Sequence, residues 1–509
     1  MKYRNPILPG FYPDPSICEA NGEFYLVNSS FDYFPGIPLH HSSDLVNWKQ
    51  LGNVLTRKSQ LPLNRQRSYP VSQGIYAPTI RHHDGFFYVI STNMSSFKTF
   101  YTWTNQPEGD WSEIITIENF AGYDPSLYFD DDGTVYLTAA AIPWTSTTKE
   151  GIIQAKLDIE TGQLLSDVKH IWGGSGYSTP EGPHLFKKDE WYYLIAAEGG
   201  TEFGHMQTIS RSKSPFGPFE NNPNNPIVSN RSTTLPIQAT GHADMLKTNS
   251  GEWVAVLHGI RPLTNHKVHH LGRETVLVPV LWTDDNWPVL GNDGRVEIEH
   301  ELKSDFKQKE RESWTDEFNQ STLDIRWNTL KNLDNSSWNV NNGLNLFGNE
   351  LNLNSSSKPP VFIGCRQQDK TCTISVELEF FPTQEGEEAG ITVFMNENFH
   401  YDLYRTKLNG EQLLILRKQV GDITHIDKMM PISDPFVSLT VSAFNDGYEW
   451  YIQQKNMEKQ LVGSGEARLL AKEIAGGFTG VYFGMYASGN GRRSGTKAQF
   501  KNFSYSIKE

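Results

Sequence analysis

One pattern of apolar and polar residues recurs five times in the first three hundred residues of the chain. Each copy has an apolar strand start, followed about eight residues later by a turn and an aromatic-rich strand. Four of the five turns contain Gly, which is typical of β-hairpins. The turn-and-strand segments are residues 21–25, 84–88, 132–136, 188–192 and 250–254.

The spacing of these copies predicts the fold of the region. An interval of roughly 50 to 60 residues is the size of one four-stranded propeller blade. Five copies therefore predict a five-bladed β-propeller over residues 1–302. In such a fold the innermost strand of each blade lines the central channel, so equivalent positions of different blades meet around one axis.

A different pattern begins after the repeat ends. Residues 303–313 form a charged, poorly apolar run that we interpret as a linker. From residue 314 to residue 509 apolar and polar residues alternate, with Asn-Gly turns at Asn342 and Asn409. This favours a β-sandwich as the second domain. Helical periodicity is scarce throughout, so we expect an all-β protein.

One position of the repeat carries candidate chemistry. Just before the apolar start of each inner strand stand Asp14, Ala77, Asp124, Glu181 and His242. Carboxylates brought together away from water cannot all keep their usual pKa values, because burial and like charges raise at least one of them. Such a group supplies an acid and a base near neutral pH, and glycoside hydrolysis needs that pair.

A purely structural explanation exists for each of these residues taken alone. Asp in an Asp-Pro-Ser sequence often accepts hydrogen bonds within a turn, and a Glu beside Gly-Pro can do the same. Ala77 shows, however, that the fold does not demand a carboxylate at this position. The convergence of Asp14, Asp124 and Glu181 on one repeat position therefore favours a catalytic role.

Composition and charge narrow the class of partner. The 509 residues exceed one ordinary core, and a net charge of -14 without a Lys/Arg-rich run argues against nucleic acid and anionic membranes. A neutral partner is favoured. Aromatic residues make up 12% of the chain, which suits stacking on sugar rings, although β-rich cores also use aromatic residues.

The sequence also bears on compartment. It has no apolar stretch near its N-terminus and none of membrane-spanning length, which predicts a cytoplasmic protein. Cys18, Cys365 and Cys372 are an odd number without zinc-site spacing, so we expect free thiols.

Several short motifs, taken together, resemble glycoside hydrolase family 43, the β-xylosidases and α-L-arabinofuranosidases. They are Pro-Asp-Pro-Ser at 13–16, Tyr-Asp-Pro-Ser at 123–126, Pro-Glu-Gly-Pro-His at 180–184, Gly-His-Ala at 241–243 and Leu-Gly-Arg-Glu at 271–274. Residues 314–318 and 477–480 resemble the start and the end of the family's C-terminal, concanavalin-like sandwich. The resemblance covers essentially the whole chain.

The resemblance implies a mechanism that inverts the anomeric centre. Asp14 would be the general base, Glu181 the general acid, and Asp124 the group that orients Glu181 and raises its pKa. An inverting pair leaves room for a water, so the carboxyls of Asp14 and Glu181 should lie roughly 6.5 to 9.5 Å apart. Arg273 matches the family's active-site arginine and would bind sugar hydroxyls and the ionised carboxylates.

Aromatic residues are the candidates for the pocket walls. Phe31 and Phe34 match a family segment that shapes the sugar pocket, and Tyr76 stands where related xylosidases usually have Trp, which leaves the sugar open. Phe478 would close the pocket if the sandwich reaches over the propeller. Trp144 and Phe203 are further candidates, but core or rim positions explain each of them better.

His242 raises the question of an ion. In parts of the family a histidine at this place faces a hydrated cation, often calcium, on the propeller axis. Calcium prefers oxygen ligands, so water would have to supply most of them. The alternative is an axial histidine held by hydrogen bonds. The chemistry itself requires no cofactor, and the resemblance allows a dimer or tetramer.

We therefore expect an exo-acting, inverting glycosidase that releases non-reducing-end β-D-xylose from xylo-oligosaccharides. An α-L-arabinofuranosidase, or one enzyme with both activities, is the close alternative. An endo-arabinanase is disfavoured because of the second domain. A carbohydrate-binding propeller without catalysis is the alternative from another class, and a protein-interaction propeller would lack the convergent carboxylates.

Overall fold

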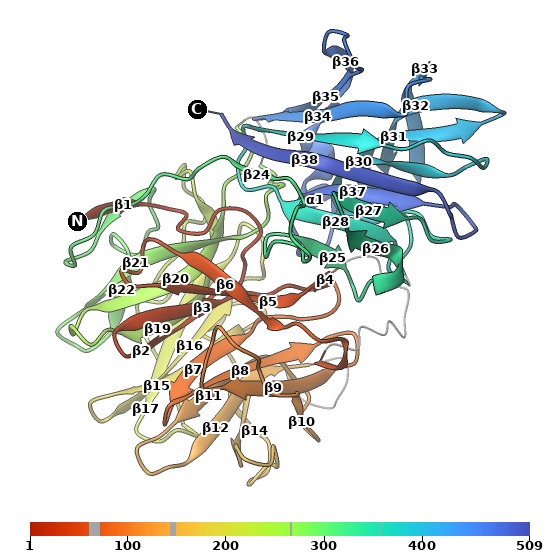
Figure 1. The fold of residues 1–509 in the computed structure, drawn as a ribbon. Helices are drawn as coiled ribbons and strands as arrows, with labels where there is room; N and C mark the ends of the chain where they lie inside the picture. The colour runs from red at the N-terminus through yellow and green to blue at the C-terminus, as the bar shows by residue number, and fades with distance from the viewer. Residues whose placement is uncertain (61–71, 143–148, 265–266, 357, 509) are drawn as a thin grey trace.

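The computed structural model describes residues 1–60, 72–142, 149–264, 267–356 and 358–508. Two bodies rich in β-structure meet along one side, and the chain passes from the lower body in Figure 1 to the upper one between β23 and β24. Among the described residues, no helix is long and apolar enough to cross a membrane.

The first body contains five four-stranded antiparallel sheets within the described residues. Each begins with an inner strand and the hairpin that the repeat predicted, as in the pairing of Ile17 with Leu26. The inner strands β2, β7, β11, β15 and β19 contact one another in a ring. The five-bladed propeller is therefore confirmed.

The blades have the following bounds. Blade one contains β2 (Ser16–Ala20), β3 (Glu23–Val27), β5 (Gly36–Ser42) and β6 (Lys49–Leu55); blade two contains β7 (Thr79–His83), β8 (Phe86–Asn93), β9 (Lys98–Thr104) and β10 (Ile115–Ile117); blade three contains β11 (Gly122–Phe129), β12 (Val135–Ala141), β13 (Ile152–Leu157) and β14 (Lys169–Trp172). Blade four contains β15 (Glu181–Lys188), β16 (Trp191–Glu198), β17 (Met206–Ser212) and β18 (Glu220–Asn221); blade five contains β19 (Gln238–Lys247), β20 (Trp253–Ile260), β21 (Glu274–Trp282) and β22 (Pro288–Leu290).

The N-terminal segment closes the propeller by pairing with its last part. Strand β1 (Lys2–Arg4) is antiparallel to β23 (Glu299–Glu301), and Leu8 forms a bridge with Thr275 of β21. Asn5 donates its side-chain amide to Leu277 O at 2.8 Å. These contacts fix the chain just before Asp14, which is the first of the three predicted catalytic carboxylates.

The second body is a sandwich of two antiparallel sheets, which confirms the predicted second fold. One sheet contains β24 (Trp314–Asp316), β26 (Trp338–Val340), β27 (Leu344–Phe347), β29 (Cys372–Glu379), β34 (Phe436–Phe444), β35 (Gly447–Gln453), β36 (Gln460–Glu466) and β38 (Lys497–Ile507). The other contains β4 (Tyr33–Phe34), β25 (Asn328–Leu330), β28 (Val361–Arg366), β30 (Glu388–Asn396), β31 (Phe399–Leu408), β32 (Glu411–Val420), β33 (Ile423–Pro431) and β37 (Tyr482–Ser488). Short helical turns are η1 (Lys58–Gln60), η2 (Asn335–Ser337), η3 (Ala467–Leu470) and α1 (Lys472–Ala475).

Strand β4 crosses the boundary between the two bodies. It lies within the first blade in sequence, yet it extends the sandwich sheet, with Phe34 opposite Thr329 and Tyr33 opposite Leu330. The ring of Tyr33 stacks on that of Tyr482 at 3.8 Å between centroids. The sequence assigned these residues to the propeller alone, and the pairing with a strand about three hundred residues later is a difference from that expectation.

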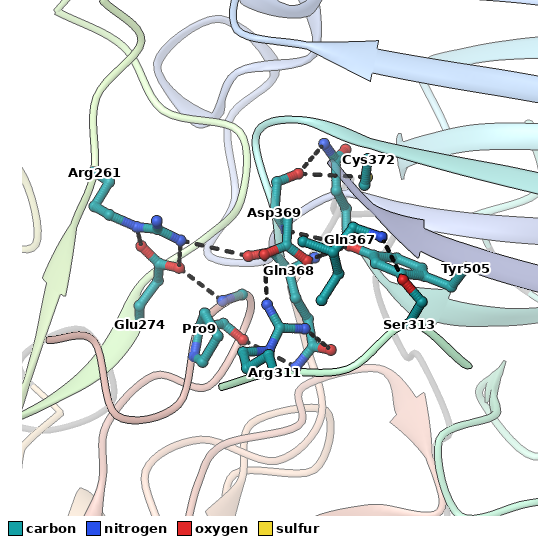
Figure 2. A network of polar contacts seen from close by, with 12 residues as sticks. Pro9, Arg261, Glu274, Arg311, Ser313, Gln367, Gln368, Asp369, Cys372 and Tyr505 are labelled. Atoms are coloured by element: carbon teal, nitrogen blue, oxygen red, sulfur yellow. Dashed lines mark hydrogen bonds and ion pairs between the residues drawn. The ribbon is translucent and has the colours of Figure 1, made fainter. Parts of the chain in front are cut away.

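A polar network joins the two bodies on the side of β21 (Figure 2). Glu274 accepts two hydrogen bonds from Arg261, both at 2.7 Å, and one from the backbone N–H of Gly10 at 2.7 Å. Gln368 of the sandwich donates to Pro9 O at 3.2 Å. A Cβ at Gly10 would lie 2.9 Å from Gln367 O, so glycine permits this close approach.

Candidate active site

The inner strands of three blades begin with an irregular turn of the backbone. A break in the pairing register follows the first residues of β11, β15 and β19. Asp14, Asp124 and His242 have positive φ values of 52°, 50° and 56°. Bulges of this kind redirect side chains and are frequent beside active sites. Here they bring side chains from different blades to one pocket.

A small pocket lies at this end of the channel. Its walls come from all five blades, including the segment before β21, and from the sandwich. The lining residues are Asp14, Phe31, Tyr76, Tyr123, Asp124, Glu181, Thr201, His242, Arg273 and Phe478. All three predicted catalytic carboxylates are therefore brought together, and each is buried, with at most 8% of its surface exposed.

Gly182, directly after Glu181, is a point of close approach beside the pocket. Its φ is 56°, and a Cβ there would lie 2.7 Å from Nε2 of His242. Any larger residue would push the His242 ring out of place. The glycine after the fourth-blade carboxylate thus allows blades four and five to approach each other at the pocket.

Asp14 is held as a carboxylate by a dense set of partners. Arg273 Nη1 donates to Asp14 Oδ1, and Ser29 Oγ donates to Oδ2 at 2.5 Å. His258 Nδ1 lies 3.0 Å from Oδ1. Burial alone would raise the pKa of Asp14, but Arg273 and the two histidines His242 and His258 outweigh it and hold the pKa well below its usual range. Asp14 is therefore ionised at neutral pH.

Asp124 and Glu181 have the opposite character. Burial and the charge of Glu181 raise the pKa of Asp124 well above its usual range, although the backbone N–H of Ala77 donates to it. Burial and the charge of Asp14 raise the pKa of Glu181 to about 8, against the opposing effect of Arg273. Because the pKa of each carboxyl is raised, the pair retains at least one proton at neutral pH.

One oxygen of this pair has a free hydrogen-bonding position. Oε1 of Glu181 is buried and has no hydrogen-bond partner among the described residues. A buried polar atom without a partner carries a cost in free energy, which a bound hydroxyl or ether oxygen would remove. The pocket therefore combines an ionised carboxylate with a protonated one whose oxygen is available to a ligand.

Three aromatic rings form the wall around Arg273. Phe31 and Phe478 stack with centroids 5.9 Å apart, and Tyr76 lies 5.1 Å from Phe31 and 6.0 Å from Phe478. The guanidinium of Arg273 lies 5.9 Å from the rings of both phenylalanines. The predicted wall residues Phe31, Tyr76, Arg273 and Phe478 thus line one pocket, with Phe478 supplied by the sandwich.

Phe34 lies elsewhere. It belongs to β4, pairs with Thr329 and packs against the cluster between the first two blades, and it is not among the described side chains that line the pocket. The physical reason is the side-chain alternation of a strand, because pairing with β25 directs Phe34 away from the ring of Phe31. Phe203 is half-buried outside the lining, and Trp144 lies outside the described residues.

Four functional side chains went unnoticed in the sequence. Tyr123 and Thr201 line the pocket, while Ser29 and His258 bind Asp14 from behind. Tyr123 precedes Asp124 directly, so adjacency was a usable signal. The other three follow or lie within second strands of their blades, where no repeat position or motif marks them.

Three side chains at this site could together hold a metal ion. Asp14, His242 and His258 form a buried group whose ligand atoms lie within 4.8 Å of one another and which could hold a metal ion. Calcium requires six to eight oxygen ligands, whereas this group offers one carboxylate, already bonded to Arg273 and Ser29, and two imidazoles. The residues do not fit directly coordinated calcium, and no chemical step below depends on a metal.

Comparison with protein families gives two matches that divide the chain between them. A profile of the glycosyl hydrolases family 43 matches residues 3–288. A profile of the β-xylosidase C-terminal concanavalin A-like domain matches residues 315–506. The first match contains every predicted site residue except Phe478, which lies within the second.

Individual relatives cover the same length. A non-reducing end α-L-arabinofuranosidase of Bacteroides ovatus is 38% identical over 99% of this chain and 94% of its own. A β-xylosidase of Bacillus subtilis is 31% identical, with both chains fully covered. The crystal structure of a xylan β-1,4-xylosidase from Bacillus halodurans superposes with a TM-score of 0.90 at 31% identity, covering 99% of each chain.

Proposed function

The chain belongs to glycosyl hydrolase family 43 and is a glycoside hydrolase of the xylosidase and arabinofuranosidase type, and on that premise we propose that it removes single pentose units from the non-reducing ends of short oligosaccharides with inversion. The observation that carries this proposal is the split between Asp14, held ionised by Arg273, and the protonated pair of Asp124 and Glu181. Two carboxyls in opposite protonation states are what glycoside hydrolysis requires.

The roles of the residues follow from these states. Asp14 takes a proton from a water molecule, which attacks the anomeric carbon of the bound sugar. Glu181 donates its proton to the glycosidic oxygen, whose bond to the anomeric carbon breaks. Asp124 shares the proton of the pair and orients Glu181. Arg273 keeps Asp14 ionised and offers hydrogen bonds to sugar hydroxyls.

The size of the pocket supports exo action. The pocket is small, its walls come from all five blades, and Phe478 of the sandwich is part of its lining. We propose that the rest of the substrate chain lies on the leaving-group side of the bound sugar. We place the carboxyls of Asp14 and Glu181 roughly 6.5 to 9.5 Å apart, as inversion requires; this remains a prediction.

We propose β-D-xylose as the sugar released, because relatives named as β-xylosidases match the whole chain. The second candidate is α-L-arabinofuranose. It is favoured by the Bacteroides ovatus relative, which is named as an α-L-arabinofuranosidase. The two pentoses present similar hydroxyls to a small pocket, so one enzyme with both activities is consistent with the site.

The deciding experiment is a parallel assay of p-nitrophenyl β-D-xylopyranoside and p-nitrophenyl α-L-arabinofuranoside, each with EDTA and with added calcium. We expect turnover of at least one substrate, undiminished by EDTA, and the ratio of the two kcat/KM values identifies the sugar. NMR of the first product should show the inverted anomer. Absence of turnover of both substrates by folded protein would contradict the pentosidase and favour a carbohydrate-binding role.

A further inference from the structure

An ion pair connects the sandwich with the propeller at the rim of the pocket. Lys472 Nζ donates to Glu202 Oε1 at 2.5 Å. The Lys472 side chain is only 12% exposed, whereas that of Glu202 is 61% exposed. Glu202 directly follows Thr201, which lines the pocket. The pair therefore stands at the pocket's edge, with the carboxylate facing solvent.

Glu202 lies on the side of the proposed acid. Glu181 begins β15 and pairs with Ala197 near the end of β16. The loop that leaves β16 then carries Thr201 and Glu202, so it rises from the strand next to the acid. The charge of Glu202 is also one of the causes that raise the pKa of Glu181. Since the acid protonates the leaving oxygen, a departing sugar occupies this side.

Lys472 belongs to the same short segment as Phe478. It is the first residue of α1, drawn between the two bodies in Figure 1, and its backbone N–H donates to His269 O at 2.9 Å. Six residues later the N–H of Phe478 donates to Ser72 Oγ at 2.7 Å. Lys472 Nζ lies 5.9 Å from the Phe478 ring centroid. One segment of the sandwich thus supplies both the cover of the pocket and the cation at its rim.

This pair contributes little to stability. Ion pairs with a solvent-exposed partner typically add little to stability. An ammonium has three N–H donors, and a carboxylate can accept several hydrogen bonds. The contact between Lys472 and Glu202 leaves donors and acceptors on both groups available to a ligand, and bonds from hydroxyls to charged groups are among the stronger ones.

We propose that Glu202 and Lys472 form the subsite for the leaving group, and that this subsite binds the hydroxyls of a neutral sugar residue. The proposal rests on the proposed function, because it assumes that Glu181 is the acid. It goes further by naming the residues that recognise the part of the substrate which departs. A neutral saccharide fits a balanced pair of charges, since neither sign is left in excess.

The test compares substrates that share the pentose and differ in the leaving group. Xylobiose has a sugar as leaving group, and p-nitrophenyl β-D-xylopyranoside has an aryl group without those hydroxyls. If arabinofuranoside is the better aryl substrate, an arabinofuranose-capped disaccharide replaces xylobiose. For Lys472→Met and Glu202→Gln we expect KM for the disaccharide to rise about tenfold. KM for the aryl glycoside should change less than twofold.

A matched control lies on the same blade. Lys213 and Glu190 form an exposed ion pair at 2.8 Å whose residues do not line the pocket, and Lys213→Met should change neither KM. Lys472→Arg keeps the charge and should restore most of the disaccharide affinity. A KM increase shared equally by both substrates would mean that the pair only holds Phe478 in place, and no change would mean that it binds nothing; either result overturns the subsite. If the unmodified enzyme hydrolyses neither substrate, the proposed function itself has failed.

Discussion

The pocket of the propeller and the interior of the sandwich each contain a buried cluster of charged residues, and the partners of these charges differ. In the sandwich, Arg417 Nε donates to Asp402 Oδ2 at 2.9 Å and Arg417 Nη2 to Glu388 Oε1 at 3.1 Å. His400 Nδ1 lies 2.9 Å from both oxygens of Asp402. Each carboxylate there has a positive or hydrogen-bonding partner in direct contact.

The pocket has the same residue types with a different balance. Three carboxylates share Arg273, which is the one arginine, without any lysine, among the described lining residues. As a result the pKa of Glu181 rises to about 8, mainly through burial and Asp14. In the sandwich, burial would raise the pKa of Asp402, but His400 and Arg417 outweigh it and lower the pKa to about 2. Burial alone therefore does not mark a chemical site; a shortage of counter-charge does.

The largest expected effect is on turnover. Glu181→Gln removes the proposed acid without changing the shape of the side chain, and kcat for xylobiose should fall by about 10²- to 10⁴-fold. Asp402→Asn, the matched change in the paired cluster, should leave kcat within twofold. Steady-state kinetics of both variants measure this. A comparable loss of kcat in both would abolish the distinction between the two clusters.

Removing each arginine should separate stability from activity. Arg417→Met leaves two buried carboxylates without their cation, which typically costs about 3 to 5 kcal/mol of stability. Arg273→Met should lower kcat strongly, because it releases Asp14 from its ion pair. It should lower the free energy of unfolding less than Arg417→Met does. Thermal and urea unfolding provide the comparison, with Arg326→Met, from a partly exposed ion pair with Asp324, as the near-neutral control. Equal destabilisation by both buried arginines would contradict it.

The stability contributed by Glu181 of the pocket and by Asp402 of the sandwich should change with pH in opposite directions. The pKa of Glu181 is raised from 4.5 to about 8, so its contribution to stability is present below about pH 4.5 and lost as pH rises through 8. Glu181→Gln should therefore be more stable than the unmodified protein above pH 8. The pKa of Asp402 is lowered from 3.8 to about 2, so its contribution is present at neutral pH and lost as pH falls toward 2.

The dependence of kcat/KM on pH should follow the pKa of Glu181. Because the protonated form of Glu181 is the proposed acid, kcat/KM should fall as pH rises through about 8. Asp14 has a pKa well below its usual range, so the acid side of the profile should be flat until strongly acidic pH. A pH profile of kcat/KM on xylobiose measures both limbs, and an alkaline limb near the usual pKa of a glutamate would contradict the assignment.

Local signals in the sequence account for most of the fold and for the centre of the site. The hairpins of the repeat depend on turn residues and apolar periodicity within one blade, so the five sheets and the convergence of Asp14, Asp124 and Glu181 could be predicted. Phe34 could not be placed, because its orientation depends on β25, almost three hundred residues away. His258 and Thr201 could not be found, since neither occupies a repeat position.

The contribution of the sandwich to the pocket was predicted from a different kind of signal in the sequence. Nothing in the periodicity of residues 314–509 directs Phe478 to the propeller, and only the family resemblance suggested it. In the structure its position depends on contacts across the interface, such as the hydrogen bond from its N–H to Ser72 Oγ. Contacts between distant segments of this kind leave no local pattern in a sequence.

The smallest expected effect concerns this point of contact between the two bodies. Phe478→Ala removes one ring of the aromatic wall, and because such ring contacts contribute about 0.5 to 1.5 kcal/mol, KM for xylobiose should rise about threefold to tenfold. Phe436→Ala, at a 51% exposed phenylalanine on the other sheet of the sandwich, is the control and should leave KM unchanged. Because the phenyl ring of Phe478 carries no group that exchanges a proton, kcat should stay within about twofold. A loss of kcat as large as that of Glu181→Gln would instead mean that the sandwich helps to set the protonation of the cluster, and the separation between the two regions would fail.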